Sequence, residues 1–192
     1  MKNRKKILAI SGSTRQNSTN HRLIKAITDI SKDVFDIQLY DGLSLLPYFN
    51  PDDDDEHVSR EVALLRQLLG NADGVIICTP EYAHGVPGSL KNAIDWTVGT
   101  SDFSHKPTVL ITASTDGKYG HQALLETLRV IEAENIDTLQ LLISFASTRI
   151  SGDNRIIDQQ TLEDVKMLLE NFEKTMNENH QKLNKETDQQ TN

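Results

Sequence analysis

The chain of 192 residues, 37% of them hydrophobic, fits one domain of ordinary size with a buried core. Its 28 acidic against 20 basic residues give a formal net charge of -8, which argues against nucleic acid or an anionic membrane as a partner. One cysteine, Cys78, excludes an intramolecular disulfide framework, and no apolar run is long enough for a membrane span or a signal peptide, so we expect a soluble, cytoplasmic protein.

Five apolar runs predict strands. Three of them are continuous, as in strands buried on both faces, whereas Phe35, Ile37 and Leu39 alternate with polar residues, as in a strand nearer an edge. A sixth run, residues 145–150, is mixed in character and is interpreted as a loop or a strand extension. The predicted strands comprise residues 6–10, 35–39, 74–78, 109–113 and 138–143.

Between these runs, apolar residues recur at a spacing of three or four, which predicts helices, and Gly70 is a typical helix stop. Strands and helices that alternate every thirty or so residues are typical of βαβ units, whose right-handed crossovers place helices on both faces of a parallel sheet. We therefore predict a three-layer, doubly wound α/β domain. The helical stretches comprise residues 23–30, 58–69, 90–96, 124–131 and 162–172.

The chain ends in a polar stretch. Residues 176–192 contain Met176, Leu183 and no other large apolar residue, so burial there cannot offset the entropy lost on ordering. We divide the chain into a domain over residues 1–175 and a disordered tail over residues 176–192.

In a doubly wound sheet, ligands bind beyond the carboxyl ends of the strands, where the strand order reverses. The loops after the first, third and fourth predicted strands are therefore the places to examine. They comprise residues 11–20, 79–88 and 114–121.

The first loop, SGSTRQNSTN, leaves a buried strand and enters a helix, where free backbone N–H groups and the helix dipole attract an anion. Hydroxyl and amide side chains add donors, and Arg15 adds a positive charge. Neither GxxxxGK[ST] nor GxGxxG is present, so the loop favours a terminal monophosphate over a nucleoside triphosphate or a dinucleotide. An ordinary helix N-cap in a polar turn is the alternative, because it uses the same residue types.

The second loop leads into a helix as TPEYAHGVPGSLKNAIDW. Its prolines and glycines fix an irregular backbone that can lay amide groups along the polar edge of a planar ligand, while Tyr82 covers apolar surface. A turn rich in Pro and Gly without any ligand is equally compatible with this spacing. We expect Trp96 in the core or in an interface rather than against a cofactor.

Together the two loops resemble one known family. GSTRQNSTN is similar to the G-S-x-R-x-x-S-x-N phosphate loop of the NADPH-dependent FMN reductases, which include quinone, azo and chromate reductases. PEYAHGVPGSLKNAIDW resembles the P-E-Y-N…P-G-x-L-K-N-A-I-D-W segment of that family. The likeness extends from Ile7 to about Phe172 and implies a flavodoxin-like fold with a five-stranded parallel sheet.

The resemblance also implies the FMN-binding residues. Residues of the first loop would hold the phosphate, those of the second would border the isoalloxazine ring, and the third loop would complete the site. These residues are Ser13, Arg15, Ser18, Thr19, Asn20, Pro80, Glu81, Tyr82, Ala83, Ser114, Thr115, Asp116 and Gly117.

Two positions depart from the family pattern. Ala83 stands where the family has Asn after Pro-Glu-Tyr, so any contact from that side chain is lost. Gly120 and His121 stand where a Gly-Gly pair usually closes the third loop. Neither change removes a residue expected to bind the phosphate.

The resemblance implies an FMN-dependent NAD(P)H oxidoreductase that passes hydride from NADPH or NADH to the flavin. A ping-pong exchange then delivers it to a quinone, azo, metal-oxyanion or free-flavin acceptor. The flavin carries this chemistry, so we nominate no catalytic side chain and no metal ligand. The family also implies a homodimer or homotetramer. A flavodoxin-like electron carrier and a flavin-free regulatory module on the same fold are the alternatives.

Several other reactive residue types are interpreted as ordinary. The histidines show no metal-ligand spacing; His84 and His121 lie in the ligand loops, and the others are expected at the surface. Cys78 ends a buried strand, where a lone cysteine behaves as a small apolar residue. Residues 52–55 form an acidic loop without calcium-site spacing. The histidines expected at the surface are His21, His57, His105 and His180.

Overall fold

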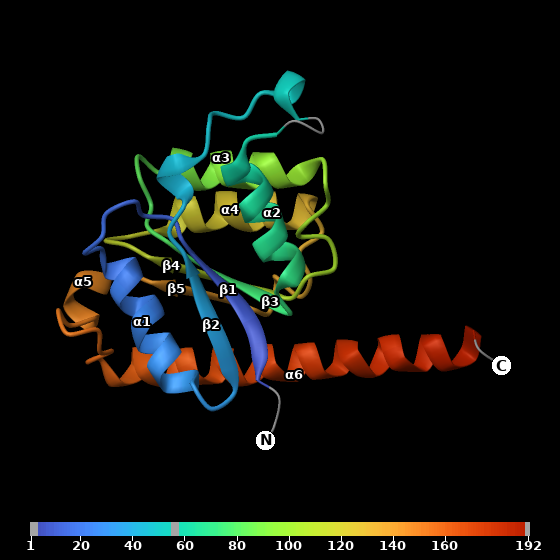
Figure 1. The fold of residues 1–192 in the computed structure, drawn as a ribbon. Helices are drawn as coiled ribbons and strands as arrows, with labels where there is room; N and C mark the ends of the chain where they lie inside the picture. The colour runs from blue at the N-terminus through green and yellow to red at the C-terminus, as the bar shows by residue number, and fades with distance from the viewer. Residues whose placement is uncertain (1–3, 55–57, 191–192) are drawn as a thin grey trace.

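A parallel sheet of five strands forms the middle layer of the structure, with helices on both of its faces (Figure 1). The computed structural model describes residues 4–54 and 58–190, with side chains placed up to Glu178. The strand order is β2-β1-β3-β4-β5, and each neighbouring pair is parallel. This confirms the predicted three-layer, doubly wound, flavodoxin-like α/β fold with a five-stranded parallel sheet. The strands are β1 (Lys5–Ser11), β2 (Phe35–Tyr40), β3 (Gly74–Thr79), β4 (Thr108–Ala113) and β5 (Gln140–Ile143).

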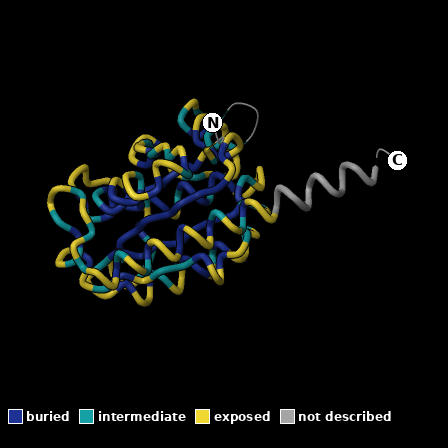
Figure 2. Tube along the Cα trace, turned by 90° about the horizontal axis from the view of Figure 1, so that it is seen from below, coloured by how far each residue is buried: buried dark blue, intermediate teal, exposed yellow. Residues whose placement is uncertain are grey.

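The two faces of the sheet are covered by different helices. Ile7 and Ala9 of β1 pack in the cluster that contains α1 and α6, whereas Leu8 and Ile10 pack in the cluster of α2, α3 and α4. In Figure 2 the buried stretches of the chain run through the middle of the molecule, with exposed stretches around them. A strand covered on both faces needs apolar residues at every position, which explains its continuous apolar run. The helices are α1 (Thr19–Ser31), α2 (Arg60–Asn71), α3 (Gly88–Val98), α4 (Lys118–Val130), α5 (Ala146–Arg149) and α6 (Gln159–Gln190), with short 3-10 turns η1 (Leu43–Leu45) and η2 (Pro51–Asp53).

Two segments differ from their predicted conformation. The run at residues 145–150 is not a strand extension, because residues 146–149 form the short helix α5. The last strand begins at Gln140 rather than Thr138, because the backbone N–H groups of Thr138 and Leu139 both bond to the carbonyl of Asn135 in a turn. Strand β2 lies at an edge, as its alternation predicts.

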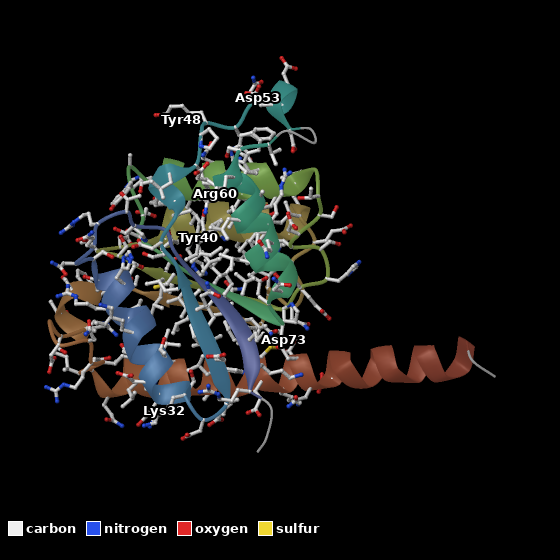
Figure 3. The ribbon with its side chains drawn as sticks, in the orientation of Figure 1. Lys32, Tyr40, Tyr48, Asp53, Arg60 and Asp73 are labelled. Atoms are coloured by element: carbon white, nitrogen blue, oxygen red, sulfur yellow. The ribbon has the colours of Figure 1, made fainter. Side chains whose placement is uncertain are left out.

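The strand order reverses between β1 and β3. The chain leaves β1 toward β2 at one edge and leaves β3 toward β4 on the other side, so the loops diverge and leave a crevice at the carboxyl edge. Figure 3 marks the two edges: Lys32 and Asp73 precede β2 and β3 at the amino edge, and Tyr40 ends β2 at the carboxyl edge.

Trp96 lies in the core, one of the two places predicted for it. Its side chain is only 1% exposed, and its indole Nε1 donates to the carbonyl of Pro47 at 2.9 Å. Asn92, one turn earlier in α3, binds the same carbonyl at 2.9 Å and accepts from the backbone N–H of Phe49 at 2.7 Å. These bonds fasten the segment between β2 and α2, where Tyr48 points outward (Figure 3), across α3.

Helix α6 continues past the body of the protein (Figure 1). Met176 is buried in the same cluster as Phe172, although it falls within the segment for which the sequence predicts disorder. Disorder in the rest of residues 176–192 stays a prediction. None of the described helices combines the length and apolar character that crossing a membrane requires.

Candidate functional site

A hollow of about 350 Å³ opens at the carboxyl edge of the sheet, within the size range of small-molecule sites. The loops after β1, β3 and β4 form most of its wall. The structure thus brings the predicted binding residues together around one hollow, except Ala83, Asp116 and Gly117, which do not line it. The lining consists of Ser13, Arg15, Ser18, Thr19, Asn20, Pro80, Glu81, Tyr82, Ala113, Ser114, Thr115, Ala146 and Ser147.

A larger hollow of about 600 Å³ lies elsewhere, between α3, α4 and the segment that joins α3 to β4. Its walls come largely from the last turns of the two helices, which run back toward the amino edge of the sheet. None of the predicted site residues lines it. Because ligands of doubly wound sheets bind at the carboxyl edge, we assign the site to the smaller hollow.

The first loop ends in a helix cap that leaves donors for a ligand. The Ser18 Oγ accepts a hydrogen bond from the backbone N–H of His21 at 3.1 Å and so caps α1. The Ser18 carbonyl accepts from the backbone N–H of Arg22, also at 3.1 Å. The first N–H groups of a helix have no partner within it, so Thr19 and Asn20 present theirs at the start of α1. Their positive partial charges favour an anion there.

Arg15 supplies the positive charge of this loop. Its exposed side chain lines the hollow and makes no hydrogen bond or ion pair with the described residues. The Oγ of buried Ser13 accepts from the backbone N–H of Arg15 at 3.3 Å and fixes the backbone at this point. The guanidinium is therefore free for charge-assisted hydrogen bonds to an anion.

The side chain of Asn20 has a structural role at the edge of the hollow. Its side chain is buried, with Nδ2 donating to the carbonyl of Ala113 at 3.1 Å and Oδ1 accepting from the Cys78 thiol at 3.2 Å. Burial raises the pKa of that thiol, so Cys78 stays protonated and serves as a donor rather than only as a small apolar residue. The amide side chain ties α1 to β3 and β4, and the backbone N–H of Asn20 is available to a ligand.

The expectation that His21 lies at the surface is wrong. Its side chain is 8% exposed, and its Nδ1 lies 2.9 Å from the Ser18 Oγ and 3.1 Å from the Ser11 Oγ. The helical spacing of apolar residues predicts only apolar side chains on the buried face of α1, so the polar His21 was expected in solvent. His105 is exposed as predicted, whereas His57 and the side chain of His180 lie outside the described residues.

The second loop makes a two-residue hairpin turn at the rim of the hollow. Tyr82 and Gly85 exchange backbone hydrogen bonds of 3.1 and 2.9 Å, and Ala83 and His84 between them have φ of 48° and 57°. Two successive positive φ values define a type I′ turn, which favours Asn and Gly. Ala83 therefore holds a strained conformation at the position where the family has Asn. The His84 ring stacks on Tyr119 with 4.5 Å between centroids, away from the lining of the hollow.

Glu81 joins the second loop to helix α4. Its carboxylate accepts from the backbone N–H of Gly120 at 2.6 Å, and its own backbone N–H donates to the Ser114 Oγ at 3.2 Å. A Cβ at Gly120 would lie 2.9 Å from the carbonyl oxygen of Gly85 and 3.0 Å from the Glu81 Cγ. The close approach of the two loops therefore requires glycine at this position.

His121, the second departure from the family, is tied back to the sheet. Its Nδ1 lies 2.9 Å from the Thr112 Oγ1 and its Nε2 lies 2.8 Å from the Gln140 Oε1. Burial lowers the pKa of this imidazole, which favours the neutral form. His121 does not line the hollow; it braces the start of α4 against β4 and β5.

Sequence reasoning missed the wall contributed by α5, namely Ala146 and Ser147. The loop after β5 docks on the third ligand loop, since the backbone N–H groups of Phe145 and Ala146 donate to the carbonyls of Thr115 and Ser114, each at 3.0 Å. The order of the strands could have predicted this wall, because β5 ends at the same edge of the sheet as β4. The mixed composition of residues 145–150 does not indicate a helix there.

The described acidic residues of this loop, residues 52–54, form no cation site. Asp52 and Asp53 are exposed, and the carboxylate of Asp54 pairs with Arg66 at 2.6 Å; Asp55 lies outside the described residues. Within residues 4–54 and 58–190, no group of three or more His, Cys, Asp or Glu side chains is placed to hold a metal ion.

Comparison with known proteins agrees with this geometry. Residues 5–148 match the model of the NADPH-dependent FMN reductase family. The chain is 29% identical over 171 residues to the NADH:(hydroxy)cinnamate reductase subunit CrdA of Vibrio ruber, covering 86% of this chain and 84% of that protein. It is 28% identical over 171 residues to a quinone reductase of Escherichia coli, covering 85% and 90% of the two chains.

Solved structures share the fold. The flavoenzyme NAD(P)H:(acceptor) oxidoreductase FerB from Paracoccus denitrificans aligns with a TM-score of 0.73 at 21% identity, covering 91% of this chain and 98% of that one. The fold and the family match together define a flavodoxin-like flavoprotein. The chain belongs to the NADPH-dependent FMN reductase family: it is an oxidoreductase with FMN as cofactor and NADPH or NADH as co-substrate.

Proposed function

We propose that this protein binds FMN in the hollow at the carboxyl edge and reduces a small quinone with electrons from NADH or NADPH. The observation that carries the proposal is the first loop, where Arg15 has no side-chain partner among the described residues and stands beside the free N–H groups that begin α1. A dianionic phosphate monoester matches this set of donors.

The rest of the hollow fits the other end of the cofactor. Tyr82, half exposed, is the one aromatic residue among its described lining residues, so a planar ring would be covered on one side and open on the other. When bound, FMN supplies the redox chemistry by accepting hydride from the nicotinamide and passing it on. The chain binds and orients the ring, and the nicotinamide and the acceptor use the open side in turn, which is a ping-pong exchange.

A quinone is the acceptor that the relatives support best. Their names include a quinone reductase, a 2-hydroxy-1,4-benzoquinone reductase and an NADPH azoreductase, all of which imply planar acceptors.

We also propose that the protein is a cytoplasmic homodimer or homotetramer. The exposed apolar side chains of Val98 and Val130, which flank the larger hollow between α3 and α4, support this proposal. Light scattering measures the oligomeric state directly.

An electron-carrier flavodoxin is the competing function on this fold. Arg15 disfavours it, because carriers of that class typically use a hydroxyl-rich phosphate loop without arginine. Anaerobic mixing of the flavin-loaded protein with NADH or NADPH should bleach the flavin without a partner reductase. Steady-state rates at several quinone concentrations should then give parallel double-reciprocal lines. A flavin that stays oxidised with both nicotinamides, yet accepts electrons from a one-electron donor, would establish the carrier instead.

A further inference from the structure

The imidazole of His21 lies directly behind the proposed phosphate site. Its Nδ1 is 2.9 Å from the Oγ of Ser18, a residue that lines the hollow, and its Nε2 is 3.8 Å from the Asp41 carboxylate. The His21 side chain is 8% exposed, whereas that of Asp41 is 79% exposed. Among the described residues, Asp41 is the charged group recorded beside this ring, and Ser11 and Ser18 are its other polar neighbours.

The hydroxyl of Ser18 has one proton, and its direction depends on His21. The Ser18 Oγ already accepts from the backbone N–H of His21 at 3.1 Å. If Nδ1 carries no proton, it must accept one from a neighbouring hydroxyl. The hydroxyl of Ser11 has another acceptor, the carbonyl of Ser13 at 3.2 Å, so Ser18 is the better donor. Ser18 then turns its proton away from the hollow and leaves a lone pair toward any anion.

A proton on Nδ1 reverses this arrangement. His21 then donates to the Ser18 Oγ, both lone pairs of that oxygen are occupied, and its proton is left to point into the hollow. The ring that presents Ser18 as a donor is therefore one that carries a proton on Nδ1.

We infer that His21 is a positioning residue: a proton on its Nδ1 turns the Ser18 hydroxyl toward the phosphate, so that binding of a phosphate monoester favours the ring with Nδ1 protonated. The inference rests on the proposed function, because it assumes that the phosphate occupies this end of the hollow. The bound ligand and His21 are coupled through a single hydroxyl group.

Nitrogen NMR of the full chain tests the coupling at about pH 7.5, where a phosphate monoester is mostly dianionic. On addition of FMN, the Nδ1 signal of His21 should shift toward that of a protonated ring nitrogen. Riboflavin, which lacks the phosphate, should not produce this shift. A His105→Asn variant is the control, because it removes an exposed histidine remote from the hollow and Asn tolerates the positive φ of that position.

Variants separate positioning from folding. His21→Leu should weaken FMN binding roughly ten- to hundredfold, the value of a hydrogen bond to a charged group, and leave riboflavin binding unchanged. The same change in a Ser18→Ala background should cause little further loss. His21→Asn, whose amide N–H₂ can donate to Ser18, should restore FMN affinity.

The two hypotheses fail differently. If Arg15→Ala weakens FMN but not riboflavin, while the His21 nitrogen signals stay fixed and His21→Leu binds FMN normally, the role of His21 is refuted and the phosphate site stands. If FMN and riboflavin bind the parent and the Arg15→Ala variant alike, the phosphate site itself is refuted.

Discussion

The turn at Ala83 offers a test of the strain inferred at the rim of the site. Ala83 has a φ of 48°, in the left-handed region that costs an L-residue with a Cβ about 1–2 kcal/mol. Ala83→Gly removes that cost but gives the unfolded chain more freedom, which is worth about 0.4–1 kcal/mol in the opposite direction. The free energy of unfolding should therefore rise by about 0.5–1 kcal/mol, or roughly 1–4 °C in melting temperature.

Thermal unfolding followed by circular dichroism measures this change, and Ala123→Gly is the matched control. Ala123 is an exposed residue inside α4, where the same substitution should lower stability by about 1 kcal/mol because glycine is a poor helix former. Opposite signs at the two positions are expected. If both variants lose stability equally, Ala83 is not strained and the turn geometry is wrong.

Three further changes test other parts of the structure. Gly120→Ala should lower the melting temperature by several degrees, because the new Cβ would meet Glu81 and the carbonyl of Gly85. In an open part of a helix the same change stabilises the protein, so a higher melting temperature would contradict the close approach of the two loops. Burial lowers the pKa of His121, so the unfolded chain binds a proton at this histidine at a higher pH than the folded protein does. The free energy of unfolding should therefore fall as the pH drops below about 6.5, and it should fall less in His121→Gln. Identical pH profiles would exclude this residue as the cause. Removal of residues 179–192 should leave flavin content unchanged and the melting temperature within a degree or two, since that segment bears Leu183 as its one large apolar residue; a larger loss would show that the segment docks.

Much of the fold is predictable because burial on two faces and burial on one face leave different sequence patterns. The continuous run of β1 and the alternation at Phe35 in β2 identify a central strand and an edge strand. The reversal of strand order then places three loops at one edge without knowledge of any side chain. Helix α5 was not predicted, because its four residues are too few to show a helical period in the sequence.

The details of the site are less predictable, because they depend on hydrogen bonds between segments far apart in the chain. The Asn20 side chain matches a phosphate-loop motif, yet it bonds to Cys78 and to the carbonyl of Ala113 across the sheet. His21 occupies a buried position where its ring bonds to two serine hydroxyls, and no apolar pattern reveals such partners. A phosphate-binding role for Arg15 can be proposed from the sequence, because a single cation in a hydroxyl-rich loop is visible without knowledge of the fold.

Titration of the flavin-free protein with FMN and with riboflavin, in the parent and in Arg15→Ala, tests the central claim most directly. Lys118→Ala is the control, since it removes an equal charge from an exposed residue that does not line the hollow. The account predicts that Arg15→Ala weakens FMN binding by about 2–3 kcal/mol, roughly 30- to 150-fold, and that Lys118→Ala and all riboflavin affinities change little. Equal FMN affinities for Arg15→Ala and the parent would contradict the assignment of the phosphate to this loop.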